Sequence, residues 1–160
     1  MRKAISRVAA VGGLLASGCV NTDPAVFVDA EISAPGAIVS AVALGTTLEG
    51  SFTLDLHLGA RASGPGSVSA EAFLITNADQ SVDILPSLEV VADKPLPVTV
   101  EPDSDVAVAF RFNTGATTLP AEKKDELCAV GGLRIKAVLK DSLQGGATPV
   151  VSVPFPPTCN

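Results

Sequence analysis

The sequence predicts an all-β fold, an antiparallel β-sandwich of about seven to nine strands with one short helical turn. Apolar and polar residues alternate with a period of two through most of the apolar segments, which is typical of half-buried strands. Stretches rich in Gly, Pro, Asn and Asp interrupt these segments at short intervals and predict turns between them. Helical periodicity is almost absent, so a sandwich explains the pattern best.

The clearest strand covers Ser51–Leu58, where the even-numbered residues are apolar and the odd-numbered residues are polar. This alternation places Leu56 in the core and His57 at the surface. Val26–Ile32 alternates in the same way until Pro35-Gly36 interrupts the chain. The core strands are expected at residues 37–44, 50–59, 67–76, 83–92, 104–113, 132–140 and 149–155.

Three local features of the sequence refine the prediction for the middle of the chain. Within residues 67–76 the alternation puts Leu74 and Phe73 on opposite faces, with Phe73 outward. Pro86 removes a backbone donor from the segment 83–92, which predicts an edge strand there. Proline followed by helix-forming residues in Pro120–Leu127 predicts one or two helical turns.

The composition excludes one class of partner. The 160 residues include 17 acidic and 11 basic residues, which gives a formal net charge of −6 at pH 7. Binding to nucleic acid depends on clustered Lys and Arg, so we expect no nucleic-acid partner. An anionic lipid surface would also repel such a chain.

The N-terminus has the pattern of a secretory signal. Three basic residues precede an apolar run, Val8–Ala16, and the segment ends in Ser17-Gly18-Cys19. A basic start, a short apolar run and a small-residue close are typical of a signal peptide and not of a membrane span. This order resembles the lipobox of bacterial lipoproteins, although Ala16 occupies the position that is usually leucine.

The resemblance to lipoproteins implies cleavage before Cys19 and acylation of that residue, with palmitate among the acyl chains. The expected organisation is a signal peptide at residues 1–18, a lipidated tether at 19–24 and one β-sandwich domain at 25–160. Cleavage leaves 8 basic and 17 acidic residues, a net charge of −9, so attachment to the membrane would depend on the acyl chains. Val20 follows the cysteine in place of aspartate, which resembles lipoproteins of the outer membrane.

Cys128 and Cys159 remain once Cys19 is assigned to lipid. In an exported protein, an even number of remaining cysteines predicts a disulfide. A metal pair or a reactive thiol are the alternatives, but neither cysteine has His or Cys neighbours in the sequence. The predicted Cys128–Cys159 bond would stabilise the fold by roughly 3–4 kcal/mol through loop closure.

The sequence offers little for catalysis or metal binding. His57 is the single histidine and lies on the polar face of its strand, so a surface role is expected. Glu101–Asp105 places acidic residues at alternate positions, as in calcium loops, but it runs directly into a strand, and a solvated turn fits better. The mixed charges of Glu122–Glu126 predict an exposed helical face. We therefore expect no enzyme activity, no cofactor and no metal site.

The number and spacing of the strands resemble an immunoglobulin-like domain, although the chain contains no Trp or Tyr and its cysteines do not fit the inter-sheet bridge of true immunoglobulin domains. Architecture alone does not determine function. The expected role is a lipid-anchored envelope module with a structural or protein-interaction function, which presents loops or an edge strand to another envelope protein. The alternative is a ligand- or glycan-binding lipoprotein, against which the absence of Trp and Tyr weighs. Apolar residues on outward positions (Phe27, Val39 and Phe73) mark either such a contact or strands that the fold covers on both sides.

Overall fold

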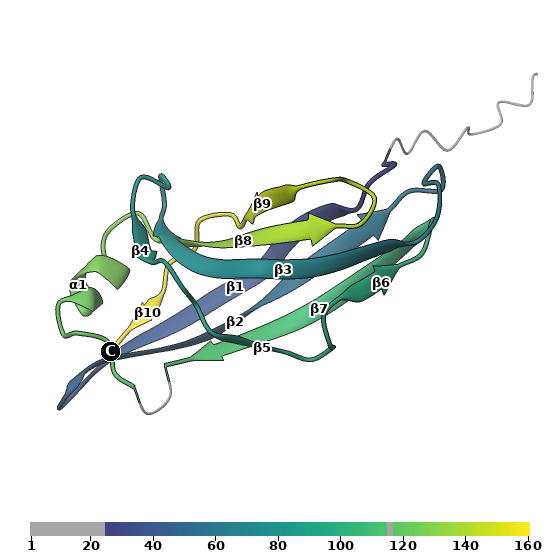
Figure 1. The fold of residues 1–160 in the computed structure, drawn as a ribbon. Coiled ribbons are helices and arrows are strands. Elements are labelled where there is room, and N and C mark those ends of the chain that lie inside the picture. The colour runs from purple at the N-terminus through teal and green to yellow at the C-terminus, as the bar shows by residue number, and fades with distance from the viewer. Residues whose placement is uncertain (1–24, 115–116) are drawn as a thin grey trace, which may run out of the picture.

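The computed structural model describes residues 25–114 and 117–160, which form two packed β-sheets (Figure 1). Sheet A has the strand order β10-β1-β2-β7-β5, and sheet B has the order β4-β3-β8-β9 with β6 also paired to β3. The predicted all-β sandwich is confirmed, with ten strands and one short helix in the described residues. Their bounds are β1 Asp29–Val42, β2 Gly45–Leu58, β3 Gly66–Asn77, β4 Asp83–Leu85, β5 Val90–Ala92, β6 Val98–Val100, β7 Ser104–Asn113, α1 Lys123–Leu127, β8 Leu133–Asp141, β9 Ala147–Val151 and β10 Thr158–Cys159.

The antiparallel hairpin of β1 and β2 runs along the whole of sheet A. The expected interruption at Pro35-Gly36 is not a break between strands, because β1 continues through it. The register with β2 shifts between Ser33 and Gly36, and Ala34 adopts a positive φ of 48°. A β-bulge thus accommodates one extra residue of β1 and lets pairing resume on its far side.

The core contains a cluster of phenylalanine rings that joins the two sheets. Phe52 of β2 stacks on Phe110 of β7 with ring centroids 4.9 Å apart. Phe73 of β3 approaches Phe110 at 4.9 Å and Phe52 at 5.5 Å. The alternation predicted for β2 is confirmed, since Leu56 is buried and the side chain of His57 is 39% exposed.

The predicted orientation of Phe73 is wrong. Its side chain is only 7% exposed and faces the core, although the alternation of β3 placed it outward. The pairing with β8 shifts register between Ala70 and Ala72. A bulge of one residue reverses which face the following side chains occupy, so Phe73 and Ile75 turn inward.

The segment 83–92 is two strands in different sheets and not one. β4 pairs with β3 in sheet B, whereas β5 pairs with β7 in sheet A. Pro86 lies directly after β4 and cannot donate a backbone hydrogen bond, so pairing with β3 ends near this residue. The chain then crosses to the other sheet before β5 begins.

Candidate functional site

Cys19, the predicted lipidation residue, lies outside the described residues, as does the rest of the predicted signal and tether at 1–24. Across residues 25–114 and 117–160, the structure contains no helix with the length and apolar character needed to cross a bilayer.

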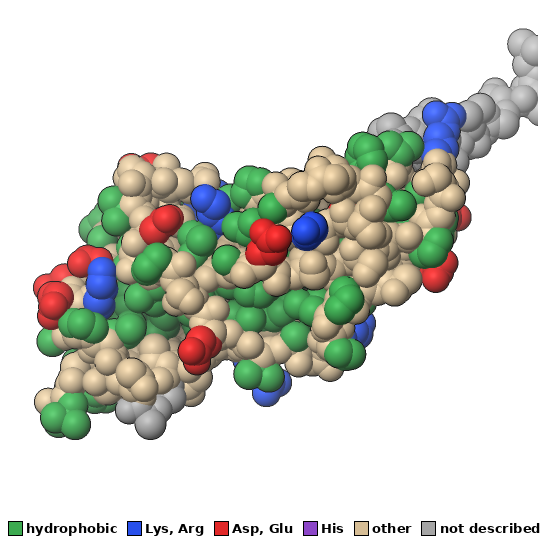
Figure 2. All heavy atoms as spheres, viewed as in Figure 1, with side chains coloured by type: hydrophobic (Ala, Val, Ile, Leu, Met, Phe, Trp, Pro, Cys, Tyr) green, Lys and Arg blue, Asp and Glu red, His purple; other side chains and the backbone are tan. Residues whose placement is uncertain are grey.

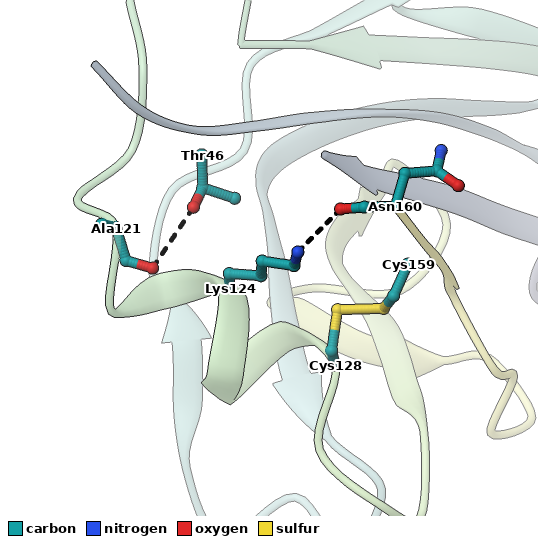
Figure 3. The surroundings of a disulfide bond; sticks show 6 residues. All are labelled: Thr46, Ala121, Lys124, Cys128, Cys159 and Asn160. Atoms are coloured by element: carbon teal, nitrogen blue, oxygen red, sulfur yellow. Dashed lines mark hydrogen bonds between the residues drawn. A yellow bond between two sulfur atoms is a disulfide. The ribbon is translucent and has the colours of Figure 1, made fainter. Parts of the chain in front are cut away.

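Cys128 and Cys159 meet at disulfide distance, with their sulfur atoms 2.02 Å apart (Figure 3). Cys128 directly follows α1, and Cys159 belongs to β10. The predicted pairing therefore connects the helical segment with the end of the chain.

Further contacts hold the C-terminal residues against sheet A. β10 runs parallel to β1, and the N–H of Asn160 donates to the carbonyl of Val39 at 2.9 Å. The ammonium group of Lys124 in α1 donates to the main-chain oxygen of Asn160 at 2.7 Å (Figure 3). This end of the sandwich is thus fixed by covalent, main-chain and side-chain contacts at once.

His57 lies on the outer face of sheet A, as predicted. Its Nδ1 atom is 2.8 Å from a carboxylate oxygen of Asp105, whose side chain is 85% exposed. A polar contact with so much solvent around it contributes little to stability. Within the described residues, no group of three or more His, Cys, Asp or Glu side chains is arranged to hold a metal ion.

The acidic segment Glu101–Asp105 forms a turn that leads into β7. The hydroxyl group of Ser104 donates to the main-chain oxygen of Glu101 at 2.6 Å, and Asp103 adopts a positive φ of 59°. The carboxylates of Glu101, Asp103 and Asp105 are exposed. These features agree with the predicted solvated turn. The predicted helical segment forms α1, in which Leu127 is buried, Asp125 and Glu126 are exposed, and Lys123 and Lys124 are half-buried.

The apolar residues expected on outward positions differ in burial. Val39 is fully buried and Phe73 nearly so, whereas the side chain of Phe27 is 46% exposed. The predicted outward orientation is therefore wrong for Val39 as well as for Phe73, since both belong to the core between the sheets, while the neighbouring Ile38 is exposed on the outer face of β1.

The tip of the β1–β2 hairpin is an exposed apolar site that the sequence did not single out. Ala41, Val42, Ala43 and Leu44 are consecutive and all exposed, with Leu44 at 87%. This apolar tip, residues 41–44, projects at the end of the molecule where the C-terminus lies (Figure 1), and hydrophobic side chains are visible there in Figure 2. The described chain begins at the opposite end.

The base of the apolar tip is held in place by residues that follow β7. The main chains of Thr46 and Leu119 exchange two hydrogen bonds, of 2.9 and 2.8 Å. The hydroxyl group of Thr118 donates to the carbonyl of Leu44 at 3.0 Å. Gly45 has a φ of +143°, and a Cβ at this position would lie 2.2 Å from the Leu119 oxygen. The tip is therefore a fixed projection of the fold.

One edge of each sheet, β9 in sheet B and β5 in sheet A, is poorly suited to pairing with another strand. Pro149 interrupts the row of donors along β9, and β5 is only three residues long. Beside β5, the Asp93 carboxylate accepts the N–H of Ala109, and the Lys94 ammonium donates to the oxygen of Ala107. These side chains occupy main-chain groups that an added strand would need.

A shallow groove of about 790 Å³ crosses the outer face of sheet A. Ile38 and Val91 lie on its two sides, and Arg111 and Ser51 lie between them. Gly36 contributes open space, because a Cβ there would meet no atom within 4 Å.

No protein-family model matches the chain, and no curated protein matches it. A functional proposal for this chain therefore rests on its sequence and its structure.

Proposed function

We propose that this protein is a lipid-anchored module of the bacterial cell envelope, held in the outer membrane through Cys19, that presents its apolar tip to another envelope protein. In this proposal the role is structural or one of interaction, not enzymatic. The observation that carries it is the run of four consecutive exposed apolar residues at 41–44.

An exposed run of this kind requires a reason. Soluble proteins scatter single apolar residues over their surfaces, but three or four consecutive ones favour aggregation and are retained where they have a function. The hydrogen bonds of Thr46 and Thr118 fix the tip in its projecting position, so little conformational entropy would be lost on binding.

The position of the tip fits a membrane anchor at the N-terminus. The described chain starts at one end of the sandwich and the tip lies at the other (Figure 1). A chain anchored through Cys19 would therefore direct the tip away from its own membrane, where a partner can reach it.

A protein partner fits the surroundings of the tip better than a second lipid surface does. Leu119 pairs with Thr46, which brings the start of the α1 segment to the base of the hairpin. Beside the half-buried Lys123 and Lys124, this segment carries three exposed carboxylates, at Glu122, Asp125 and Glu126, the last of which pairs with Lys123. Anionic lipid would repel these groups. The expected partner presents an apolar pocket with basic residues at its rim.

The groove of sheet A is the site for the alternative function, binding of a glycan or small ligand. Sugar rings usually stack on exposed Trp or Tyr, both of which are absent from the sequence. Phe112, the aromatic residue of the groove lining, is only 4% exposed. The tip therefore supports a protein contact more strongly than the groove supports a glycan.

Site-specific photo-crosslinking in cells tests the contact. A photoreactive amino acid replaces Ala43 in the full-length chain, and the adducts are identified by mass spectrometry. We expect a defined protein adduct that decreases when Leu44→Ser is added. The matched control is Val91→Ser, which removes another exposed apolar side chain, at 74%, from a different place. A yield of protein adduct that Leu44→Ser does not lower, or an absence of protein adducts, would contradict the proposed contact.

The anchor is tested separately by Cys19→Ser. We expect this variant to leave the membrane fraction, because the acyl chains supply the attachment. A variant that stays with the membranes after a high-salt wash would show that the lipoprotein proposal is wrong.

A further inference from the structure

The outer face of sheet A is acidic. Five carboxylates project from this face, whereas Arg111 is the single Lys or Arg in the strands of the sheet. The register aligns Glu31 with Asp55 on neighbouring strands, and Asp105 lies on the next strand, beside His57. We call these five residues the acidic face: Asp29, Glu31, Glu49, Asp55 and Asp105.

The outer face of sheet B carries the opposite charge along one strand. Arg134, Lys136 and Lys140 alternate on β8 with the buried residues of the core. We call these three residues the basic stripe. The neighbouring strand β9 has no charged residue. The carboxylates of the sheet are Glu71 of β3, Asp83 of β4 and Asp141 at the end of β8, and the Asp141 carboxylate accepts the main-chain N–H groups of Val28 and Leu143.

The residues of the basic stripe differ in whether they support the fold. Arg134 donates to the main-chain oxygens of Ala78 and Ser152, each at 2.7 Å, so its guanidinium group supports the fold. Lys136 and Lys140 are four residues apart on the same face, about 13 Å at ~3.3 Å per residue. Their ammonium groups are the ones placed to meet a partner.

We propose that a second copy of this chain packs its basic stripe against the acidic face of the first. The two patches lie on opposite faces of one sandwich, so the contact is heterologous and generates rows of copies in place of closed dimers. Strand addition is disfavoured by Pro149 at the β9 edge and by Asp93 and Lys94 at the β5 edge, which favours a contact through the faces.

The net negative charge of the chain does not prevent attraction between the acidic face of one copy and the basic stripe of another. Repulsion between whole molecules is screened beyond about 8 Å at physiological salt, whereas charges in direct contact are screened less. The described chain begins at one end of the sandwich, so a membrane attached there would leave both faces directed sideways, toward neighbouring copies (Figure 1). This inference rests on the charges of the two faces and not on the apolar tip.

The test uses a photoreactive residue at Ala109, an exposed position on the outer face of sheet A, in the full-length chain. We expect adducts between two copies, with the second copy attached through β8 or β9. Adducts that join sheet A to sheet A, or no adduct between copies, would overturn the proposal.

Substitutions that reverse the charge of either patch test whether the acidic face contacts the basic stripe. Glu31→Lys with Asp105→Lys should lower the adduct yield by about tenfold, because like charges would then face each other. Lys136→Glu with Lys140→Glu should lower it similarly. The chain that carries all four changes should regain part of the adduct, since the reversed positions of the two patches again carry opposite charges, although Asp29, Glu49 and Asp55 keep their sign. Failure of the fourfold variant to recover, while its melting temperature stays near that of the wild type, would contradict the proposed contact.

Two controls complete the experiment. Glu126→Lys and Arg61→Glu make the same kinds of change at exposed positions outside both patches and should leave the yield unchanged; a comparable loss would mean that net charge and not the patches governs association. The unaltered chain provides a readout that does not depend on the folding of variants. Its adduct yield should fall between about 50 mM and about 500 mM NaCl, and a yield independent of salt would overturn the electrostatic contact.

Discussion

Leu44 and Leu48 lie four residues apart on the same hairpin, yet Leu44 is 87% exposed and Leu48 is fully buried. Leu48 lies within the core cluster, where residues of both sheets surround it. Leu44 lies in the turn between β1 and β2, and this end of the hairpin projects past the strands of sheet B (Figure 1). The difference shows that position relative to the opposing sheet, and not apolar character, decides which leucine is buried.

The largest effect is expected inside the core. Phe52 is 2% exposed and its ring contacts Phe73, Phe110 and Phe112. Phe52→Ala should lower the free energy of unfolding by about 3–5 kcal/mol, because it removes buried area and leaves a cavity. Urea denaturation followed by far-UV circular dichroism measures this loss. A loss below 1 kcal/mol, on the order of a surface substitution, would mean that the aromatic cluster does not join the sheets.

Removal of the disulfide should have the next largest effect. The bond closes a segment with a sequence separation of 31, and the double variant Cys128→Ser, Cys159→Ser loses this constraint on the unfolded chain. We expect a loss of about 2–4 kcal/mol. Mass spectrometry of a non-reduced digest confirms the pairing first, and a free Cys128 thiol in protein from the envelope would contradict it.

A smaller effect is expected at the base of the apolar tip. Gly45→Ala introduces a side chain where φ is +143° and where the Leu119 oxygen is close. Strain in such a backbone region costs on the order of 1–3 kcal/mol. Gly64→Ala is the matched control, because no atom lies within 4 Å of its added Cβ. Equal melting temperatures for the two variants would show that the tip is not fixed by this close approach.

Much of the fold could be predicted from the period-two pattern. In β2 the alternation runs without a bulge from Phe52 to Leu58, so both the strand and its buried face follow from the sequence. In β3 one extra residue near Ala72 reverses the faces, and no residue type in that stretch signals the bulge. The crossing between sheets after Pro86 was missed for a related reason, since a proline ends pairing without revealing where the chain goes next.

The apolar tip could not be separated from the core in the sequence. Residues 37–44 form one apolar run, and the pattern predicted a core strand throughout. The run continues past the region that the second sheet covers, and the extent of that cover depends on strands distant in the sequence. The Cys128–Cys159 pairing was predictable because, with Cys19 assigned to lipid, one combination remained.

The central claim is that the apolar tip belongs to the surface and is free to bind, whereas the same residue type four positions on belongs to the core. Equilibrium unfolding of Leu44→Ala and Leu48→Ala, each against the wild type, tests this directly. Leu44→Ala should stay within about 0.5 kcal/mol of the wild type, while Leu48→Ala should lose about 2–5 kcal/mol. Comparable losses in the two variants would show that Leu44 is packed within the fold, and the tip would then have no free apolar surface to offer a partner.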